Sequence, residues 1–297
     1  MERDYAPKGV KFYYIYKALA HPEYHHYVMP FTLKERLMHV REAKRTLGSE
    51  IPWVCDGMDN KVKHALGGMP NAEFIVGPDG LVVERRVWSS PDKLRENLAA
   101  LVGPVEHPTR IEDLHLPTLP PPQSVARNIV PPLEVQHPMR AVKIKPDLHD
   151  AKMPFYVKLR AEVDSDFQET GTGQMYLGFH LDPLYHVHWN NQADPLEFKV
   201  TGPASIHISP SAGQAPQVEE HADADPREFL VDLKTDSKGE SGPLDLEVHY
   251  FACDDDNTFC VPVTQRYQIA LKVDHDGGSA MRRWEHGKRF RSAANRR

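Results

Sequence analysis

Apolar and polar positions along the first third of the chain predict strands and helices in turn. Residues 10–16 are mostly β-branched and aromatic, which favours a buried strand, and residues 51–55 favour a second strand. Between these runs, Thr32 and Glu35 have the spacing of a capping box. Apolar residues then recur at helical spacing up to Gly48. We therefore expect a strand, a helix and a strand in this order.

A short helix, a hairpin and a last helix are expected next. Residues 59–66 have a helical pattern, and apolar runs at 74–76 and 81–83 flank the turn sequence Gly-Pro-Asp-Gly. Ser90 followed by a proline is typical of a helix start, and the leucines after it lie on one helical face. Together these elements predict an α/β domain over residues 1–103.

A proline-rich stretch separates this domain from a second one with a different pattern. Residues 104–137 contain prolines that keep the chain extended and exclude regular helix. Beyond them, runs of alternating polar and apolar residues are separated by Gly, Pro, Asn and Asp, which is typical of an antiparallel β-sandwich. We expect this all-β domain over residues 138–275, with strands at 156–163, 229–233, 244–250 and 267–273.

Composition narrows the possible classes of function. A chain of 297 residues suits two domains, and with 40% hydrophobic and 26% charged residues each can bury an ordinary core. The net charge of −6 gives no argument for a nucleic-acid partner, and residues 276–297 are expected to be a disordered basic tail. No apolar run is long enough to span a bilayer, and residues 1–9 lack the apolar stretch of a signal peptide.

Two of the three cysteines lie close together, and this spacing is the main chemical signal. Three cysteines are too few for a disulfide-stapled scaffold. Cys253 and Cys260 are expected to end one strand and begin the next, so the short loop between them lets their side chains approach bonding distance. The pair is a redox-active disulfide, a structural disulfide or two unpaired thiols. Cys55, at the end of a predicted strand, is expected to be buried and unreactive.

Carboxylates stand directly beside the first cysteine of this pair. Asp254, Asp255 and Asp256 follow Cys253 in the sequence. Nearby negative charge disfavours a thiolate, so these residues would raise the thiol pKa of Cys253, and they would also select a basic partner. The alternative is a polar turn that uses aspartates for its local geometry.

Three histidines form a possible metal site. His186 and His188 lie two residues apart on a predicted strand and would share one face, with His180 nearby in the sequence. Neutral imidazoles suit copper or zinc. The alternative is a polar strand face whose intervening residues point into the core. We expect no other cofactor.

Three short motifs stand out in the first domain: residues 16–21 (YKALAH), residues 55–60 (CDGMDN) and Gly68-Met69-Pro70. Through these motifs the domain resembles the iodothyronine deiodinase family, a branch of the thioredoxin superfamily. The resemblance implies a thioredoxin-like fold with His21 near the active site, and with Met69 and Pro70 in a cis-proline loop.

The nucleophile of that family lies ahead of residue 1 in this resemblance. The family places a selenocysteine or cysteine at the start of its first helix, where the helix N-terminus favours the thiolate. Residues 1–9 resemble the end of that helix, so the first strand and the start of the active-site helix are missing. We expect the reading frame to extend upstream through a stop-type codon read as selenocysteine, into a signal-like or anchor segment, a strand and a nucleophile. Deiodinase-like activity is expected only with that nucleophile.

The second domain has its own motifs around the cysteines, residues 249–253 (HYFAC) and 259–262 (FCVP). Through these motifs, and through residues 178–191, it resembles the periplasmic N-terminal domain of the thiol:disulfide interchange protein DsbD. The resemblance implies an immunoglobulin-like β-sandwich in which Cys253 and Cys260 are the catalytic, redox-active pair. It also implies an extracytoplasmic location and a thioredoxin-like or membrane reductase as partner.

The sequence therefore predicts a thiol–disulfide oxidoreductase that relays electrons through Cys253 and Cys260, attached to a deiodinase-like redox domain. Phe259 and the three aspartates are expected beside the pair. One alternative is a non-catalytic binding or scaffold module with a structural disulfide, and another is a His-rich metal-binding protein.

Overall fold

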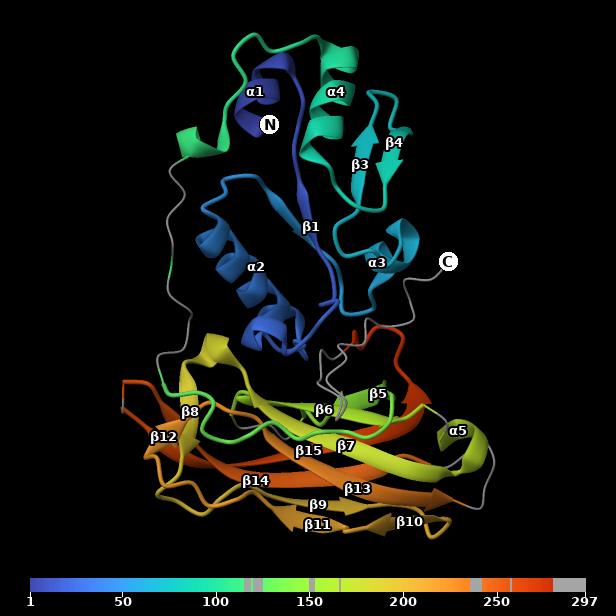
Figure 1. Ribbon diagram of the computed structural model, residues 1–297, viewed down its shortest axis with the longest axis vertical. Coiled ribbons are helices and arrows are strands. Elements are labelled where there is room, and N and C mark those ends of the chain that lie inside the picture. Colours follow the sequence, from blue (N-terminus) through green and yellow to red (C-terminus); the bar gives the residue numbers. More distant parts are fainter. Residues whose placement is uncertain are drawn as a thin grey trace. The chain divides into compact units, whose positions relative to one another are not determined.

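The chain divides into two compact units in the computed structural model (Figure 1). The first unit contains Met1–Ala20 and Thr32–Pro120, and the second contains His21–Phe31 and Pro121–Arg297. The predicted linker prolines at 117 and 120–122 and the basic tail from residue 280 lie outside the described residues. Those residues are 1–114, 119, 125–149, 153–165, 167–235, 242–256 and 258–279.

The first unit is α/β and follows the predicted order of strand, helix, strand, helix, hairpin and helix. Strand β1 (Tyr14–Tyr16) pairs in parallel with β2 (Trp53–Cys55), and α2 (Leu33–Leu47) connects them. The strand expected over residues 10–16 is shorter in the structure, because its pairing with β2 begins only at Tyr14. The remaining elements are α1 (Glu2–Tyr5), η1 (Ala6–Lys8), α3 (Lys61–Leu66), β3 (Glu73–Val76), β4 (Val82–Arg86), α4 (Pro91–Val102) and η3 (Ile111–Leu114).

Helix α2 begins and ends where its sequence predicts. The Thr32 hydroxyl accepts a hydrogen bond from the backbone N–H of Glu35, and the Glu35 carboxylate accepts one from the backbone N–H of Thr32, both at 3.2 Å. Gly48 ends the helix in the left-handed conformation, with φ of 56°. The predicted capping box is therefore confirmed.

We expect Thr32→Ala to lower the free energy of unfolding by about 1 kcal/mol, because an N–H group of the first helical turn loses its acceptor. Urea unfolding followed by circular dichroism measures this change. Thr46→Ala is the matched control, since Thr46 lies at the other end of α2, where its hydroxyl donates only to carbonyls of its own helix. Equal losses in the two variants would contradict the role of the cap.

The loop around Pro70 differs from the one that the deiodinase resemblance implies. The Met69–Pro70 peptide bond is trans, and the cis bond found among the described residues joins Ser209 to Pro210. The Lys17 ammonium donates hydrogen bonds to the carbonyls of Gly67 and Met69, at 3.0 Å each, and these contacts hold the turn. The expected cis-proline loop is therefore wrong for this chain.

The second unit is built almost entirely of strands. Its main sheet has the order β10-β13-β7-β6-β5-β15-β14-β8-β12, and β9 pairs with β14 and β11. One half of this sheet consists of β10, β13, β7 and β6, and the other consists of β15, β14, β8 and β12 with β9 and β11. Strand β5 joins the two halves, because Met139–Ala141 pair with β6 while residues 142–146 pair with β15. The bounds are η2 (Tyr24–His26), β5 (Met139–Pro146), β6 (Val157–Asp164), α5 (Phe167–Thr170), β7 (Thr172–Leu181), η4 (Pro183–Tyr185), β8 (Val187–Asn190), β9 (Glu197–Thr201), β10 (Ile206–Ser209), β11 (Ala212–Gln214), β12 (Ala222–Asp223), β13 (Arg227–Thr235), β14 (Leu244–Asp254) and β15 (Cys260–Val273).

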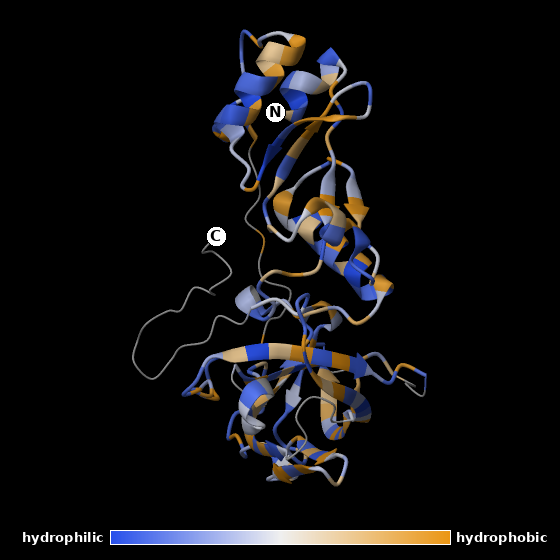
Figure 2. Cartoon of the chain, turned by 90° about the vertical axis from the view of Figure 1, so that its right-hand side faces the viewer, coloured by the Kyte–Doolittle hydropathy of each residue, from blue (hydrophilic) through white to orange (hydrophobic). Residues whose placement is uncertain are grey.

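The core of this unit lies between the two halves of the sheet. The Phe198 ring, on β9, lies 6.1 Å from the Phe179 ring on β7 and 4.7 Å from the Phe229 ring on β13. Hydrophilic and hydrophobic residues alternate along the strands (Figure 2), and β15 shows the matching alternation of exposed and buried positions. This alternation places one side of each half on the shared core.

Strand β6 departs from the predicted alternation, because its polar side chains are buried along with its apolar ones. The Lys158 ammonium donates to the carbonyl of Phe155 at 2.6 Å, and the Arg160 guanidinium donates to the Glu162 carboxylate at 2.7 Å. Arg160 also donates to the carbonyl of Gly277 at 2.8 Å. Charged residues are buried here because each one has polar partners.

Residues 21–31 help to bury this face of β6, although they lie between two elements of the first unit in the sequence. The Glu23 carboxylate lies 3.5 Å from the Arg160 guanidinium. The Phe31 ring packs edge-on against the rings of Phe155 and Tyr267, at 5.9 Å from each. We refer to residues 21–31 as the inserted segment.

Candidate functional site

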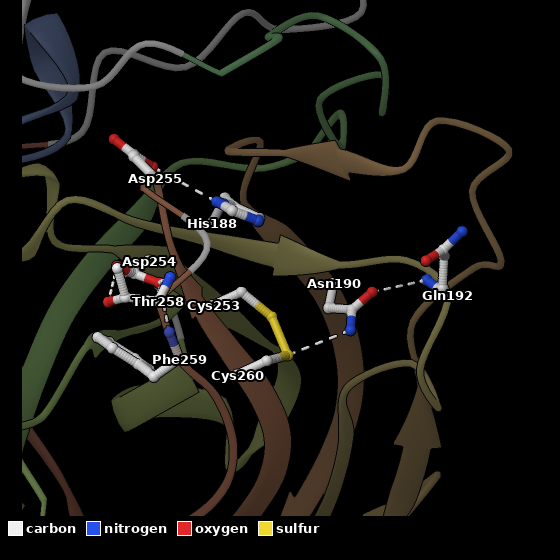
Figure 3. Close-up of a disulfide and its surroundings, with 9 residues drawn as sticks. All are labelled: His188, Asn190, Gln192, Cys253, Asp254, Asp255, Thr258, Phe259 and Cys260. Atoms are coloured by element: carbon white, nitrogen blue, oxygen red, sulfur yellow. Dashed lines mark hydrogen bonds and ion pairs between the residues drawn. A yellow bond between two sulfur atoms is a disulfide. The ribbon is translucent and has the colours of Figure 1, made fainter.

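Cys253 and Cys260 form a disulfide at the end of the β14–β15 hairpin (Figure 3). The antiparallel register places the two residues directly opposite each other, with Cα atoms 4.0 Å apart. Cys253 is the next-to-last residue of β14, and Cys260 is the first residue of β15. The structure therefore confirms the predicted pairing.

Cys55 is not part of this pair and remains a free thiol. It ends β2 in the first unit, and its side chain is half-buried where the sequence predicted a buried one. Burial raises the pKa of the Cys55 thiol, and the nearby Arg36 guanidinium only partly opposes this effect. A raised thiol pKa disfavours the nucleophilic thiolate at neutral pH.

The two sulfur-bearing residues differ in their access to solvent. Cys253 is only 5% exposed, and it lies on a central strand, paired with His188 of β8 on one side and with Cys260 of β15 on the other. Cys260 is exposed. Thiol–disulfide exchange requires an incoming thiolate to reach one sulfur atom, so access favours attack at Cys260.

The carboxylate of Asp254 holds the loop between the cysteines. It accepts hydrogen bonds from the backbone N–H groups of Thr258 and Phe259, at 2.7 and 2.8 Å, and from the Thr258 hydroxyl at 2.5 Å. Desolvation would raise the pKa of the Asp254 carboxyl, but these donors outweigh it and hold the pKa below its usual value. For Asp254, the structure supports the expectation of a turn built on an aspartate.

Asp255 turns toward a histidine of the neighbouring strand. Its backbone N–H donates to the carbonyl of His186 at 2.8 Å, and its carboxylate lies 3.4 Å from Nδ1 of His188 (Figure 3). Asp256 is exposed on the loop. Two of the three aspartates thus have partners of their own, and an effect of all three on the thiol pKa of Cys253 stays a prediction.

Aromatic side chains pack against the loop between the two cysteines. The Phe259 ring lies 6.0 Å from the ring of Tyr156, which packs edge-on against Tyr185 at 5.4 Å. Phe259 also packs against the main core. This packing fixes Phe259 next to Cys260, where the sequence predicts it.

The three candidate metal ligands are not brought together. The expectation that His186 and His188 share a strand face is wrong, because His186 lies before β8 in a left-handed conformation with φ of 53°. His188 is buried beside Asp255, and His180 on β7 lies 3.4 Å from the Tyr176 hydroxyl. In the part of the chain that the structure describes, no group of three His, Cys, Asp or Glu residues could hold a metal ion.

The residues that the deiodinase resemblance singled out belong to different units. His21 begins the inserted segment, and its Nδ1 lies 3.0 Å from the Ser279 hydroxyl. Met69 and Pro70 belong to the first unit. A site that His21 shares with Met69 and Pro70 therefore stays a prediction.

Asn190 contacts the disulfide and was not predicted as a site residue. It ends β8, and its side-chain amide donates to the Cys260 sulfur at 3.2 Å (Figure 3). The adjacent Asn191 belongs to a buried network with Asp223 and Arg227. The Asn-Asn pair falls inside residues 178–191, which carried the resemblance, but nothing in the local pattern connects it to a cysteine 70 residues away.

Comparison with protein-family models, with curated proteins and with solved structures finds no match to this chain. Within the described residues, the helices are all too short or too polar to cross a membrane. The disulfide and its neighbours are therefore the features of the chain that indicate a function.

Proposed function

We propose that this protein is a thiol–disulfide oxidoreductase, or electron-relay protein, that exchanges disulfides through Cys253 and Cys260. The observation that carries the proposal is the asymmetry of the pair, in which an exposed Cys260 is bonded to a buried Cys253. Such an arrangement gives an incoming thiolate one accessible sulfur atom and leaves the second cysteine protected from side reactions.

The exchange proceeds in two balanced steps. A thiolate of a reduced dithiol partner attacks the Cys260 sulfur, which forms a mixed disulfide and releases Cys253 as a thiolate. The second thiolate of the partner then attacks the partner's sulfur in the mixed disulfide, and Cys260 leaves as a thiolate. The partner gains a disulfide, the protein gains two electrons, and the released thiolates take up protons from solvent.

The proposal includes a fold and a partner for each unit. The antiparallel strand order of the second unit supports an immunoglobulin-like sandwich, and the parallel β1–β2 pair connected by α2 supports a thioredoxin-like first unit. With the two sequence resemblances, this favours a deiodinase-like domain that receives electrons from the disulfide-bearing one. The electron donor would be a thioredoxin-like or membrane reductase in an extracytoplasmic compartment.

A structural role is the weaker candidate for this disulfide. The two cysteines are separated by 7 positions and already face each other across a paired hairpin. Because loop-closure entropy grows with loop length, so short a loop contributes only about 2–3 kcal/mol in the chain-entropy model. The backbone of the hairpin is in addition paired along β14 and β15.

Redox titration of the purified chain tests the proposal. We expect the Cys253–Cys260 disulfide to open and close reversibly with a midpoint between about −270 and −180 mV, the range of thioredoxin-like and isomerase-like proteins. Alkylation followed by mass spectrometry measures the reduced fraction in defined glutathione buffers. Cys55→Ser is the matched control and should keep the same midpoint, because Cys55 is a free thiol of the other unit. A midpoint below about −300 mV would indicate a structural disulfide and overturn the proposal.

A further inference from the structure

The amide of Asn190 has a fixed orientation toward the disulfide. Its Oδ1 atom accepts a hydrogen bond from the backbone N–H of Gln192 at 3.0 Å, so Nδ2 must face the other way. On that side Nδ2 lies 3.2 Å from the Cys260 sulfur (Figure 3). A backbone N–H can only donate, so the contact with Gln192 settles which end of the amide reaches the sulfur.

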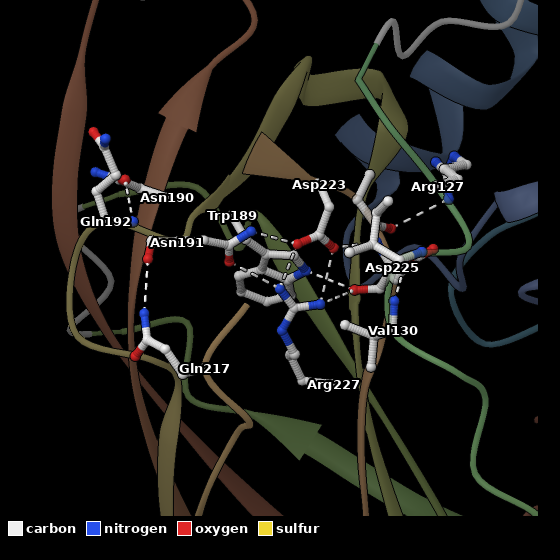
Figure 4. Close-up of polar contacts among 12 residues, drawn as sticks. Arg127, Val130, Trp189, Asn190, Asn191, Gln192, Gln217, Asp223, Asp225 and Arg227 are labelled. Atoms are coloured by element: carbon white, nitrogen blue, oxygen red, sulfur yellow. Dashed lines mark hydrogen bonds and ion pairs between the residues drawn. The ribbon is translucent and has the colours of Figure 1, made fainter. Parts of the chain in front are cut away.

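The next residue, Asn191, is fixed by four contacts. Its side chain accepts from the Arg227 guanidinium at 3.1 Å and donates to the Asp223 carboxylate at 2.7 Å (Figure 4). Its backbone N–H donates to the carbonyl of His221 at 3.1 Å, and its carbonyl accepts from the Gln217 amide at 2.9 Å. These contacts leave the backbone that carries Asn190 little freedom to move.

Arg227 and Asp223 form a buried ion pair that contacts the Asn191 side chain. Asp223 is 0% exposed and Arg227 is 3% exposed, and two guanidinium nitrogens contact the carboxylate at 2.9 and 2.7 Å. The guanidinium also lies over the Trp189 ring, 5.1 Å from its centre. Burial raises the pKa of the Asp223 carboxyl, but hydrogen bonds from Arg227 and Asn191 outweigh it and hold the pKa below its usual value.

We infer that Asn190 is a catalytic residue of the disulfide exchange, whose amide stabilises Cys260 as a thiolate, and that Asn191, Asp223 and Arg227 are positioning residues that hold it there. This inference rests on the proposed function. In the second exchange step, Cys260 leaves the mixed disulfide and its sulfur takes the electron pair. A hydrogen bond to the developing thiolate favours that form and therefore speeds its departure.

Other charged groups near the disulfide face different partners. His188 and Asp255 lie beside Cys253 and contact each other, and the Asp254 carboxylate points into its own loop. His221 contacts the side chain of Gln192. Asn190 is thus the side chain with a hydrogen bond to the Cys260 sulfur among the described contacts of this region.

The pH dependence of Cys260 alkylation in the reduced full chain tests the inference, with iodoacetamide as the probe and peptide mapping to separate the cysteines. In Asn190→Ala, we expect the midpoint of the profile to rise by about one pH unit, the effect of losing one ordinary hydrogen bond to a charged sulfur. Alkylation at pH 7 should slow about threefold, because a tenfold smaller thiolate fraction is partly offset by the higher nucleophilicity of a more basic thiolate.

Two further variants complete the experiment. Gln192→Ala is the matched control, because the contact with Asn190 uses its backbone N–H and survives the change. Asn191→Ala should shift the midpoint in the same direction as Asn190→Ala, by a smaller amount. An unchanged midpoint in Asn190→Ala, or an equal shift in Gln192→Ala, would overturn the role of Asn190. An unchanged midpoint in Asn191→Ala alone would overturn the positioning role.

The outcome is independent of the proposed function, because alkylation measures the thiolate whether or not the pair exchanges disulfides. A shifted midpoint together with a disulfide that resists glutathione buffers would retain the amide contact and reject the oxidoreductase. A reversible disulfide with unshifted midpoints would retain the oxidoreductase and reject the role of Asn190.

Discussion

Arg227→Met is expected to lower the free energy of unfolding by about 3–5 kcal/mol, because it leaves the Asp223 carboxylate buried without its cation. The two side chains are 3% and 0% exposed, so water cannot replace the lost partner. Asn191 also loses one of its hydrogen bonds. Urea unfolding at pH 7 measures the loss.

Arg266→Met is the matched control for this variant. Arg266 pairs with Glu247 on the same sheet, but its side chain is 57% exposed, so the change should cost no more than about 1 kcal/mol. The double variant Arg227→Met with Asp223→Leu should recover part of the lost stability, since it removes the unpaired charge. A loss in Arg227→Met no larger than that in Arg266→Met would contradict a stabilising role for the buried network.

The pH dependence of this effect has a definite sign. The pKa of Asp223 is lower in the folded protein than the ordinary value of 3.8. Its contribution to stability is therefore present above that value and is lost as the pH falls through the lower, folded-state pKa. In Arg227→Met the desolvated carboxyl loses the guanidinium that lowers its pKa, so it takes up a proton at a higher pH than in the wild type, and the penalty of the variant should shrink as the pH falls through that range.

Cys260→Ser is expected to abolish disulfide exchange, whereas Cys253→Ser should trap a mixed disulfide. The exposed Cys260 of the second variant still reacts with a disulfide, but no second cysteine is present to release the product. Glutathione disulfide serves as the probe, in a Cys55→Ser background. Mass spectrometry should show one glutathione on Cys260 in Cys253→Ser and little on Cys253 in Cys260→Ser.

Equal modification of the two variants would show that Cys253 is as accessible as Cys260. That result would contradict the order of attack drawn from the 5% exposure of Cys253. Both variants should remain folded, because the hairpin that carries the pair is held by paired backbone along β14 and β15.

Local signals in the sequence were enough for most elements of the first unit. The cap formed by Thr32 and Glu35, the turn between β3 and β4, and the start of α4 at Ser90 each depend on residues within a few positions of one another. The cysteine pairing was predictable for the same reason, since a short loop between two strands brings its ends together.

Features that depend on distant residues were not predictable in this way. The alternation of neighbouring residues predicts a strand at His186, but His186 ends the turn at η4 and lies before the first residue of β8. Asn190 reaches Cys260 only because β8 and β14 are adjacent in the folded sheet. The buried charges of β6 have partners in the inserted segment and near Gly277, at opposite ends of the chain.

The inserted segment sets an order for folding during synthesis. Its residues leave the ribosome early, but Tyr267, which packs against Phe31, is made more than 200 positions later. At about 5–20 residues per second, Phe31 waits roughly 10–50 s for that partner. In the later part of this interval the first unit has its whole sequence available, while Phe31 still lacks its contact with Tyr267. The nascent chain therefore exposes the Phe31 ring early in synthesis. A fragment that begins at the proline-rich linker would contain the strands of the second unit but not the inserted segment.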